Sequence, residues 1–138
     1  MSPQQFRVRG IPAPQGSKRH VGRGILVESS KRVGPWREAV KAAALAAGVE
    51  PIHGPTIASI RFYLPRPKSH YRANGQLKLT APTFCDKRPD VDKLLRSTLD
   101  ALTDLGLIDD DARIVDLTTT KRYHSHPGAL VTYWGADT

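Results

Sequence analysis

Residues 88–116 read RPDVDKLLRSTLDALTDLGLIDDDARIVD, a helical pattern with carboxylates at both ends. Pro89 is typical of the start of a helix, and Gly106 is typical of the position just after its last turn. Between them, apolar residues recur at intervals of three and four, the spacing of one helix face. The pattern predicts a helix over residues 90–105 with a buried stripe centred on Val91, Leu95, Thr98 and Leu102 and flanked by Leu94, Leu99 and Leu105.

The remainder of the chain predicts one further helix and four strands. Apolar residues have helical spacing over residues 36–47, with Pro35 in the first turn and Gly48 after the last. Extended segments are predicted at residues 5–9, 57–64, 114–123 and 130–134. Together these elements predict an α+β fold: a single domain over residues 1–138 with a mixed β-sheet and two main helices.

Charge is distributed unevenly along this chain of 138 residues. The formal net charge is +8 and the isoelectric point is near 10.0. Residues 1–80 hold 14 Lys and Arg against 3 Glu, whereas residues 81–138 hold 7 Lys and Arg against 10 Asp. A basic surface attracts the phosphates of nucleic acid, so the composition predicts a nucleic-acid partner. A basic domain without such a partner is the alternative.

The cellular location follows from what the sequence lacks. The first thirty residues contain no apolar run of signal-peptide length, and no stretch approaches the roughly 20 apolar residues of a membrane span. The single cysteine, Cys85, forms no internal disulfide. We therefore expect a cytoplasmic protein with no membrane partner.

Two irregular segments carry positive charge. Residues 11–19 form a predicted loop rich in Pro and Gly, in which Gly16-Ser17-Lys18 lacks the residue order of a phosphate-binding P-loop. We therefore expect no nucleotide cofactor; the loop contacts a DNA backbone or is merely solvated. Residues 65–83 contain an Asn74-Gly75 turn that predicts a small hairpin. This segment is either a surface loop or a basic arm whose Tyr71 stacks on a base.

Asp90 and Asp92 form the first candidate metal site. On a regular helix, residues two apart point about 200° away from each other, so the two carboxylates converge only if Asp90 lies at the N-cap. A helix N-terminus favours negative charge, and carboxylate oxygens suit Mg²⁺. The alternative is an N-cap residue with an acidic first turn and no metal.

Arg96 has two possible roles. It follows Asp92 by four residues and precedes Asp100 by four, the spacing of an ion-pair ladder along one helix face. In a phosphodiesterase, the same guanidinium would bind the scissile phosphate or stabilise its developing charge. Basic residues on the first helix, Arg37 and Lys41, are similarly either a solvated face or part of a DNA-binding surface.

Asp109, Asp110 and Asp111 supply the third set of carboxylates. A helix over residues 92–105 is about 20 Å long, so this set and the Asp90–Asp92 pair cannot share one ion unless the chain folds back. In a homodimer with antiparallel helices, the Asp loop of one chain would reach Asp90 and Asp92 of the other. We therefore expect a composite site across a homodimer interface.

The order of these motifs resembles one known family. Residues 88–93 read RPDVDK, residues 99–102 read LDAL and residues 110–115 read DDARIV. In this order and spacing they resemble the RusA-like Holliday junction resolvases of bacteria and their phages. The resemblance covers about 30 residues, with a looser match at residues 12–14 and 18–19.

The resemblance implies a homodimeric, Mg²⁺-dependent endodeoxyribonuclease that introduces paired nicks into four-way DNA junctions, in recombination and repair, encoded by a bacterium, a prophage or a phage. Mn²⁺ would substitute for Mg²⁺. The family's catalytic, metal-binding aspartates fall on Asp90, Asp92 and Asp111. Its basic residue, usually a lysine, falls on Arg96, with Lys93 as the alternative.

These observations lead to one expected mechanism. Mg²⁺-assisted hydrolysis would use Asp90, Asp92 and the partner chain's copy of Asp111. The predicted DNA-backbone contacts are Lys18, Arg19, Lys87, Arg88 and Lys93. Two other hypotheses are a nuclease for other branched DNA, such as flaps and forks, and a metal-independent nucleic-acid binding module whose aspartates are caps and loop residues.

Overall fold

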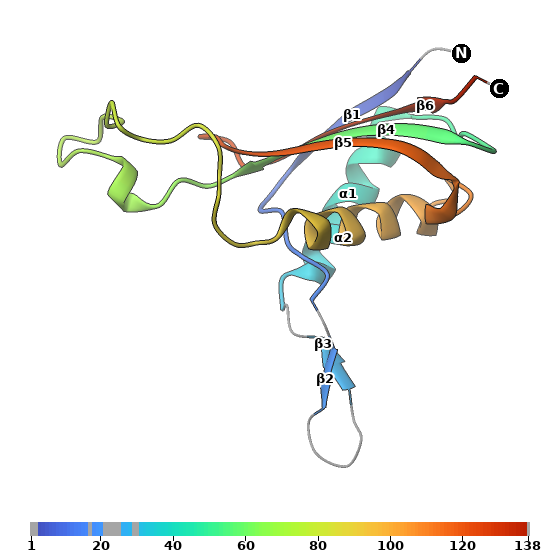
Figure 1. The fold of residues 1–138 in the computed structure, drawn as a ribbon, viewed down its shortest axis with the longest axis horizontal. Helices are drawn as coiled ribbons and strands as arrows, with labels where there is room; N and C mark the ends of the chain where they lie inside the picture. Colours follow the sequence, from blue (N-terminus) through green and yellow to red (C-terminus); the bar gives the residue numbers. More distant parts are fainter. Residues whose placement is uncertain (1–2, 17, 21–25, 29–30, 138) are drawn as a thin grey trace.

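The computed structural model describes residues 3–16, 18–20, 26–28 and 31–137, and Figure 1 shows its elements. The predicted α+β class is confirmed: two helices lie on one face of a four-stranded mixed sheet. In chain order the elements are β1 (Gln4–Arg9), β2 (Lys18–His20), β3 (Leu26–Glu28), α1 (Val33–Ala47), β4 (Thr56–Leu64), α2 (Val91–Asp104), β5 (Ile114–Tyr123) and β6 (Gly128–Gly135).

The main sheet has the order β1-β6-β4-β5. β4 and β5 are parallel, whereas β6 is antiparallel to both β1 and β4. Because α2 connects the two parallel strands, it runs back across the sheet, and its N-terminus lies near the ends of β4 and β5 (Figure 1). We name this end of the sheet, where Leu64 and Tyr123 lie, the carboxyl edge. Ligands of open sheets with parallel strands commonly bind at such an edge.

The core lies between the helices and the sheet. On β4, Ala58, Ile60, Phe62 and Leu64 alternate with more exposed residues, which confirms the strand predicted at residues 57–64. Helix α1 contributes Trp36, Val40 and Ala44 to the same core. In the described parts of the chain, no helix has the length and apolar character needed to span a membrane.

Helix α2 ends as its sequence predicts but is rotated from the predicted stripe. Gly106 has φ +74°, a left-handed conformation that favours glycine, and its N–H donates to the Thr103 carbonyl. The side chains buried on α2 are Leu94, Ser97, Thr98, Leu99, Ala101 and Leu102. Val91 and Leu95 are only half-buried, so their predicted place at the centre of the stripe was wrong. Ser97 lies there instead because its hydroxyl finds partners inside the protein.

A buried hydrogen bond joins the two helices. The Trp36 indole N–H donates to Thr98 Oγ1 at 3.1 Å, and that hydroxyl donates to the Leu94 carbonyl at 2.9 Å. Thr98→Val keeps the volume but leaves the buried indole N–H without an acceptor. We expect a loss of about 1–3 kcal/mol in the free energy of unfolding, measured by urea denaturation. Thr118→Val, the same substitution at an exposed position of β5, is the control and should change stability far less; equal effects would contradict the role of the hydrogen bond.

Other boundaries also differ from the sequence predictions. Helix α1 begins at Val33, three residues before the predicted start, and β6 extends beyond the predicted strand at both ends. Lys18 and Arg19, predicted to lie in a loop, belong to β2, which pairs with β3 in a two-stranded antiparallel ribbon projecting away from the sheet (Figure 1). The predicted hairpin around Asn74-Gly75 is confirmed by an antiparallel bridge between Tyr71 and Leu77.

Candidate metal centre and nucleic-acid interface

Asp90 and Asp92 lie at the N-terminus of α2, near the carboxyl edge. Asp90 is the N-cap, with extended backbone angles φ −69° and ψ 138°, and its carboxylate does not cap the helix. Asp92 is the second residue of the helix and is exposed. Asp90 thus lies outside the helix, as convergence of the two carboxylates requires. Because neither carboxylate caps the helix, both are available to a ligand at a terminus that favours a phosphate.

Lys93 is the nearest cation to this pair. Its Nζ lies 3.6 Å from Asp90 Oδ2, and the Asp90 side chain is 54% exposed. An exposed ion pair of this kind contributes at most about 1 kcal/mol, so a divalent cation or a phosphate displaces it at little cost. The predicted DNA contacts Lys87 and Arg88 are also exposed and directly precede Pro89.

Lys121 holds the segment before Asp90, a role that we did not predict from the sequence. From β5, its Nζ donates to the Lys87 carbonyl at 2.6 Å and to the Pro89 carbonyl at 2.8 Å. The sequence carries no local signal for this role, because it depends on strand pairing: Lys121 pairs with the buried Phe62 and so lies on the helix-facing side of its strand. A cation on that face needs acceptors, and here they are the two carbonyls.

The N-terminal loop is fixed against the same end of α2. The buried Ser97 hydroxyl donates to the Ala13 carbonyl at 2.7 Å, and the Gln15 N–H donates to the Lys93 carbonyl at 2.9 Å. Pro12 and Ala13 are buried, so this part of the predicted basic loop is not merely solvated. The backbone of Lys18 and Arg19 follows in β2; their side chains lie outside the described part of the structure.

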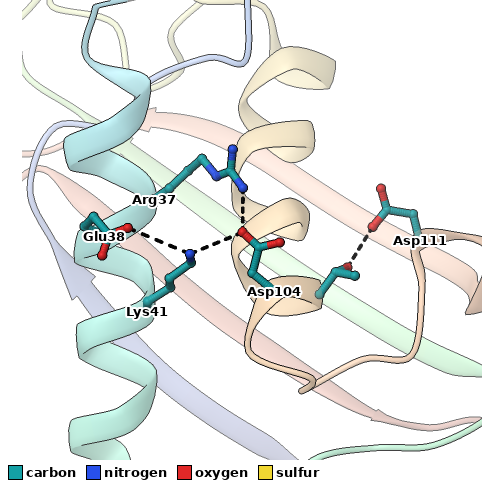
Figure 2. Close-up of polar contacts among 6 residues, drawn as sticks. Arg37, Glu38, Lys41, Asp104 and Asp111 are labelled. Carbon is teal, nitrogen blue, oxygen red and sulfur yellow. Dashed lines mark hydrogen bonds and ion pairs between the residues drawn. The ribbon is translucent and has the colours of Figure 1, made fainter.

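Asp111 lies near the other end of α2. Its Oδ1 accepts a hydrogen bond from Thr103 Oγ1 at 3.2 Å (Figure 2). Partial burial raises the pKa of the Asp100 carboxyl, and the nearby negative charge of Asp111 raises it further. The structure thus separates the three predicted metal ligands into two places on one chain.

The other two aspartates of the triplet make no hydrogen bond or ion pair with α2 among the described residues. Asp109 accepts hydrogen bonds from the Gly54 N–H and from His53 Nδ1, both at 2.8 Å, and these bonds lower the pKa of its carboxyl. Asp110 precedes the short 3₁₀ turn Asp111–Arg113 and is exposed. Of the triplet, Asp111 is therefore the member that hydrogen-bonds to the helix among the described residues.

The distance between the two places is fixed by the helix. Thr103, which contacts Asp111, follows Asp92 by eleven residues, or about 16 Å along the axis. Among the residues that the structure describes, no three His, Cys, Asp or Glu side chains gather closely enough to hold a metal ion. A site that contains Asp90, Asp92 and Asp111 therefore requires a second chain, as the sequence hypothesis proposed.

Arg96 does not form the predicted ladder. In the described part of the chain it makes no ion pair with Asp92 or Asp100, although its charge lowers the pKa of Asp100 weakly. Its guanidinium is exposed, so of the two roles considered, phosphate binding is the one that this arrangement leaves open.

Arg37 and Lys41 are engaged in ion pairs between the helices. Arg37 lies 2.6 Å and Lys41 3.2 Å from Asp104 Oδ2 (Figure 2). Hydrogen bonds from Lys41 and Arg37 lower the pKa of the Asp104 carboxyl. These cations join α1 to α2 rather than forming the free basic face predicted from the sequence.

Comparison with known families agrees with these motifs. The family model described as Endodeoxyribonuclease RusA matches residues 9–133 of the 138. The chain belongs to the RusA endodeoxyribonuclease family. The matched region contains both ends of α2, the Asp111 turn, β4, β5 and β6 up to Tyr133, but only the last residue of β1, Arg9. A comparison with curated proteins finds no match. Membership in the RusA family supports a DNA endonuclease, and the resemblance seen in the sequence is confirmed.

Proposed function

We propose that this RusA-family protein is a homodimeric, Mg²⁺-dependent endodeoxyribonuclease that resolves four-way DNA junctions by paired nicks. The observation that carries the proposal is the arrangement at the N-terminus of α2. Asp90 and Asp92 lie there without a role in capping, beside the exposed cations Lys87 and Arg88 and the half-buried Lys93. Carboxylates for a divalent cation and cations for a DNA backbone thus meet at one place.

The donor set fits a hard cation, with one position supplied by the partner. Asp90 and Asp92 provide oxygen ligands, and Asp111 of a second chain would complete the set. When bound, Mg²⁺ polarises the scissile phosphate and lowers the pKa of the attacking water. Arg96, one turn after Asp92, binds the phosphate and stabilises its developing negative charge. Lys87, Arg88 and Lys93 bind neighbouring phosphates and orient the strand.

Two-fold symmetry accounts for paired nicks. A four-way junction has four strands that form two pairs related by two-fold symmetry, and a symmetric dimer presents two equivalent sites. Each strand of one pair then meets one site, so the two nicks are placed symmetrically about the branch point.

The proposal is tested by incubating a synthetic four-way junction with the protein and Mg²⁺. Linear duplexes with the sequences of its arms, a flap and an Asp90→Asn protein are the controls. We expect symmetric nicks on the junction, no cleavage of the duplexes and no nicks with the variant, which still binds the junction. Preferred cleavage of the flap would identify a different substrate. Tight binding without cleavage under any divalent metal would contradict the nuclease proposal.

We expect Lys121 to be a positioning residue that raises the affinity of the metal site for Mg²⁺. Lys121→Met removes both hydrogen bonds that hold the carbonyls of Lys87 and Pro89, so Asp90 is less well placed. Because residues that orient metal ligands typically contribute 10–100-fold to metal affinity or activity, we expect the Mg²⁺ concentration for half-maximal cleavage to rise roughly 10-fold. Lys78→Met removes an exposed cation elsewhere and should leave the Mg²⁺ requirement unchanged. An unchanged requirement in Lys121→Met would contradict the positioning role.

A further inference from the structure

A pocket of about 500 Å³ opens at the carboxyl edge, between three segments of the chain. Its lining comes from the N-terminal loop 11–14, the end of β4 with residues 65–67, and Cys85 with residues 87–89; Arg32 and Tyr123 complete it. Its volume falls in the roughly 300–1,000 Å³ range of pockets that bind small molecules. Pro89, which lines it, directly precedes Asp90, so the pocket adjoins the candidate metal centre.

The interior of this pocket is apolar and firmly held. Five prolines line it, and Leu64, Cys85 and Tyr123 form a small buried cluster at its base. Ser97 fixes one wall through the Ala13 carbonyl. The Cys85 side chain and burial raise the pKa of Tyr123 to about 12, so its phenol is neutral at physiological pH. Such an interior accepts a flat apolar group and does not repel an anion.

The rim of the pocket is cationic. Arg32, Arg66, Lys87 and Arg88 line it, and no carboxylate is among the described lining residues. Arg66 is held in place: its Nη1 donates to the Pro82 carbonyl at 2.8 Å, and its Cζ lies 5.4 Å from the centre of the Tyr123 ring. A planar guanidinium fixed over an aromatic ring can bind a phosphate or stack on a base.

We propose that this pocket binds one unstacked nucleotide of the DNA strand, adjacent to the phosphate that is cut. Its base lies against the apolar interior and its phosphate contacts the cationic rim. The proposal rests on the proposed function in one respect, since the scissile phosphate is placed at Asp90 and Asp92. Apolar surface together with cations is the combination by which proteins hold single-stranded nucleotides. Extruding a base from a stack costs only a few kcal/mol, and the pocket offsets this cost.

The test compares intact junctions with junctions that lack a single base. Abasic nucleotides are placed one at a time at successive positions on either side of the branch point, and affinity is measured by fluorescence anisotropy without divalent metal. At one position, removal of the base should weaken binding by wild-type protein about 5- to 100-fold, the contribution of one base stacked on an aromatic side chain. Arg66→Gln should bind intact and abasic junctions alike.

Two further proteins make the comparison specific to the pocket. Ile11→Asp places a carboxylate at the pocket lining on an exposed residue, and it should also remove the difference between intact and abasic junctions. Arg61→Gln removes one arginine charge from an exposed position of β4 that does not line the pocket, and it should retain the difference. Thermal unfolding of each variant by circular dichroism confirms that it is folded.

The possible outcomes distinguish a failure of the pocket proposal from a failure of the proposed nuclease function. Cleavage by wild-type protein with no position sensitive to base removal would overturn the pocket proposal. A sensitive position whose effect is the same in all three variants would also overturn it. A sensitive position that Arg66→Gln and Ile11→Asp abolish would support the pocket, even if wild-type protein fails to cut the junction, and that failure would count against the nuclease alone.

Discussion

Asp92→Asn should reduce junction cleavage at least about 100-fold, because changes to residues that merely orient metal ligands already cost 10–100-fold. Asp92 is exposed in the first turn of α2 and makes no hydrogen bond or ion pair among the described residues. Its carboxylate is therefore available to a metal, and the substitution breaks no hydrogen bond or ion pair among the described residues. The measurement is the single-turnover rate of junction nicking with saturating protein and Mg²⁺.

Junction binding and stability provide the controls for this substitution. A carboxylate in the first turn stabilises a helix by about 0.3–1 kcal/mol, so Asp92→Asn should lower stability only slightly. Its affinity for the junction in the absence of metal should be unchanged or higher, since one negative charge near the DNA is removed. Asp116→Asn, at an exposed position of β5, is the matched control and should cleave normally. Normal cleavage by Asp92→Asn would remove Asp92 from the site.

The elements predicted well are those whose local signals agree. Helix α2 combines an apolar period with Pro89 before it and Gly106 after it, and its observed bounds, Val91–Asp104, differ little from the prediction. β5 was predicted at its observed bounds, and β4 showed its buried face by alternation. In such segments, propensity, pattern and end signals favour one structure, so tertiary packing has little to override.

The errors arise where distant residues decide the structure. Ser97 and Thr98 are polar, yet both are fully buried because Ala13, Leu94 and Trp36 supply hydrogen-bond partners. The predicted stripe included Thr98 but omitted Ser97, so the buried face of α2 is rotated from that stripe toward Ser97. The sheet order and the β2–β3 ribbon depend on pairings between segments that carry no signal within a short stretch of sequence.

The candidate site likewise has features that the sequence predicts and features that depend on contacts across the fold. Helix geometry requires Asp90 to lie at the N-cap if its carboxylate is to converge with that of Asp92, so this part of the site could be predicted from the sequence. The support from Lys121 and the use of Asp109 by Gly54 and His53 depend on contacts across the fold. The predicted ion pairs of Arg96 failed for a related reason: i, i+4 spacing permits a contact between exposed side chains but stabilises it by only about 0.2–0.5 kcal/mol.

Pairing two defective chains should restore activity if the metal site is shared between them. Asp111 hydrogen-bonds to Thr103, which lies about 16 Å along α2 from Asp92, so a site composed of Asp90, Asp92 and Asp111 needs two chains. In a heterodimer of an Asp90→Asn chain with an Asp111→Asn chain, one composite site is intact and the other carries both substitutions. We expect each homodimer to be inactive, and the heterodimer to nick junctions at about half the wild-type rate, on one strand of the pair.

The experiment uses differently tagged chains that are co-expressed and purified through both tags, so only heterodimers are assayed. The reciprocal heterodimer pairs a wild-type chain with a chain carrying both Asp90→Asn and Asp111→Asn. If the site is composite, this second heterodimer is inactive, because each site receives one substituted residue. A site within one chain reverses the pattern: the first heterodimer is inactive and the second nicks one strand. Each heterodimer contains one Asp90→Asn and one Asp111→Asn substitution, so the total charge and the metal affinity outside the site are equal in the two. They differ only in whether the two substitutions lie on different chains or on the same chain, so the comparison identifies the chain that supplies Asp111.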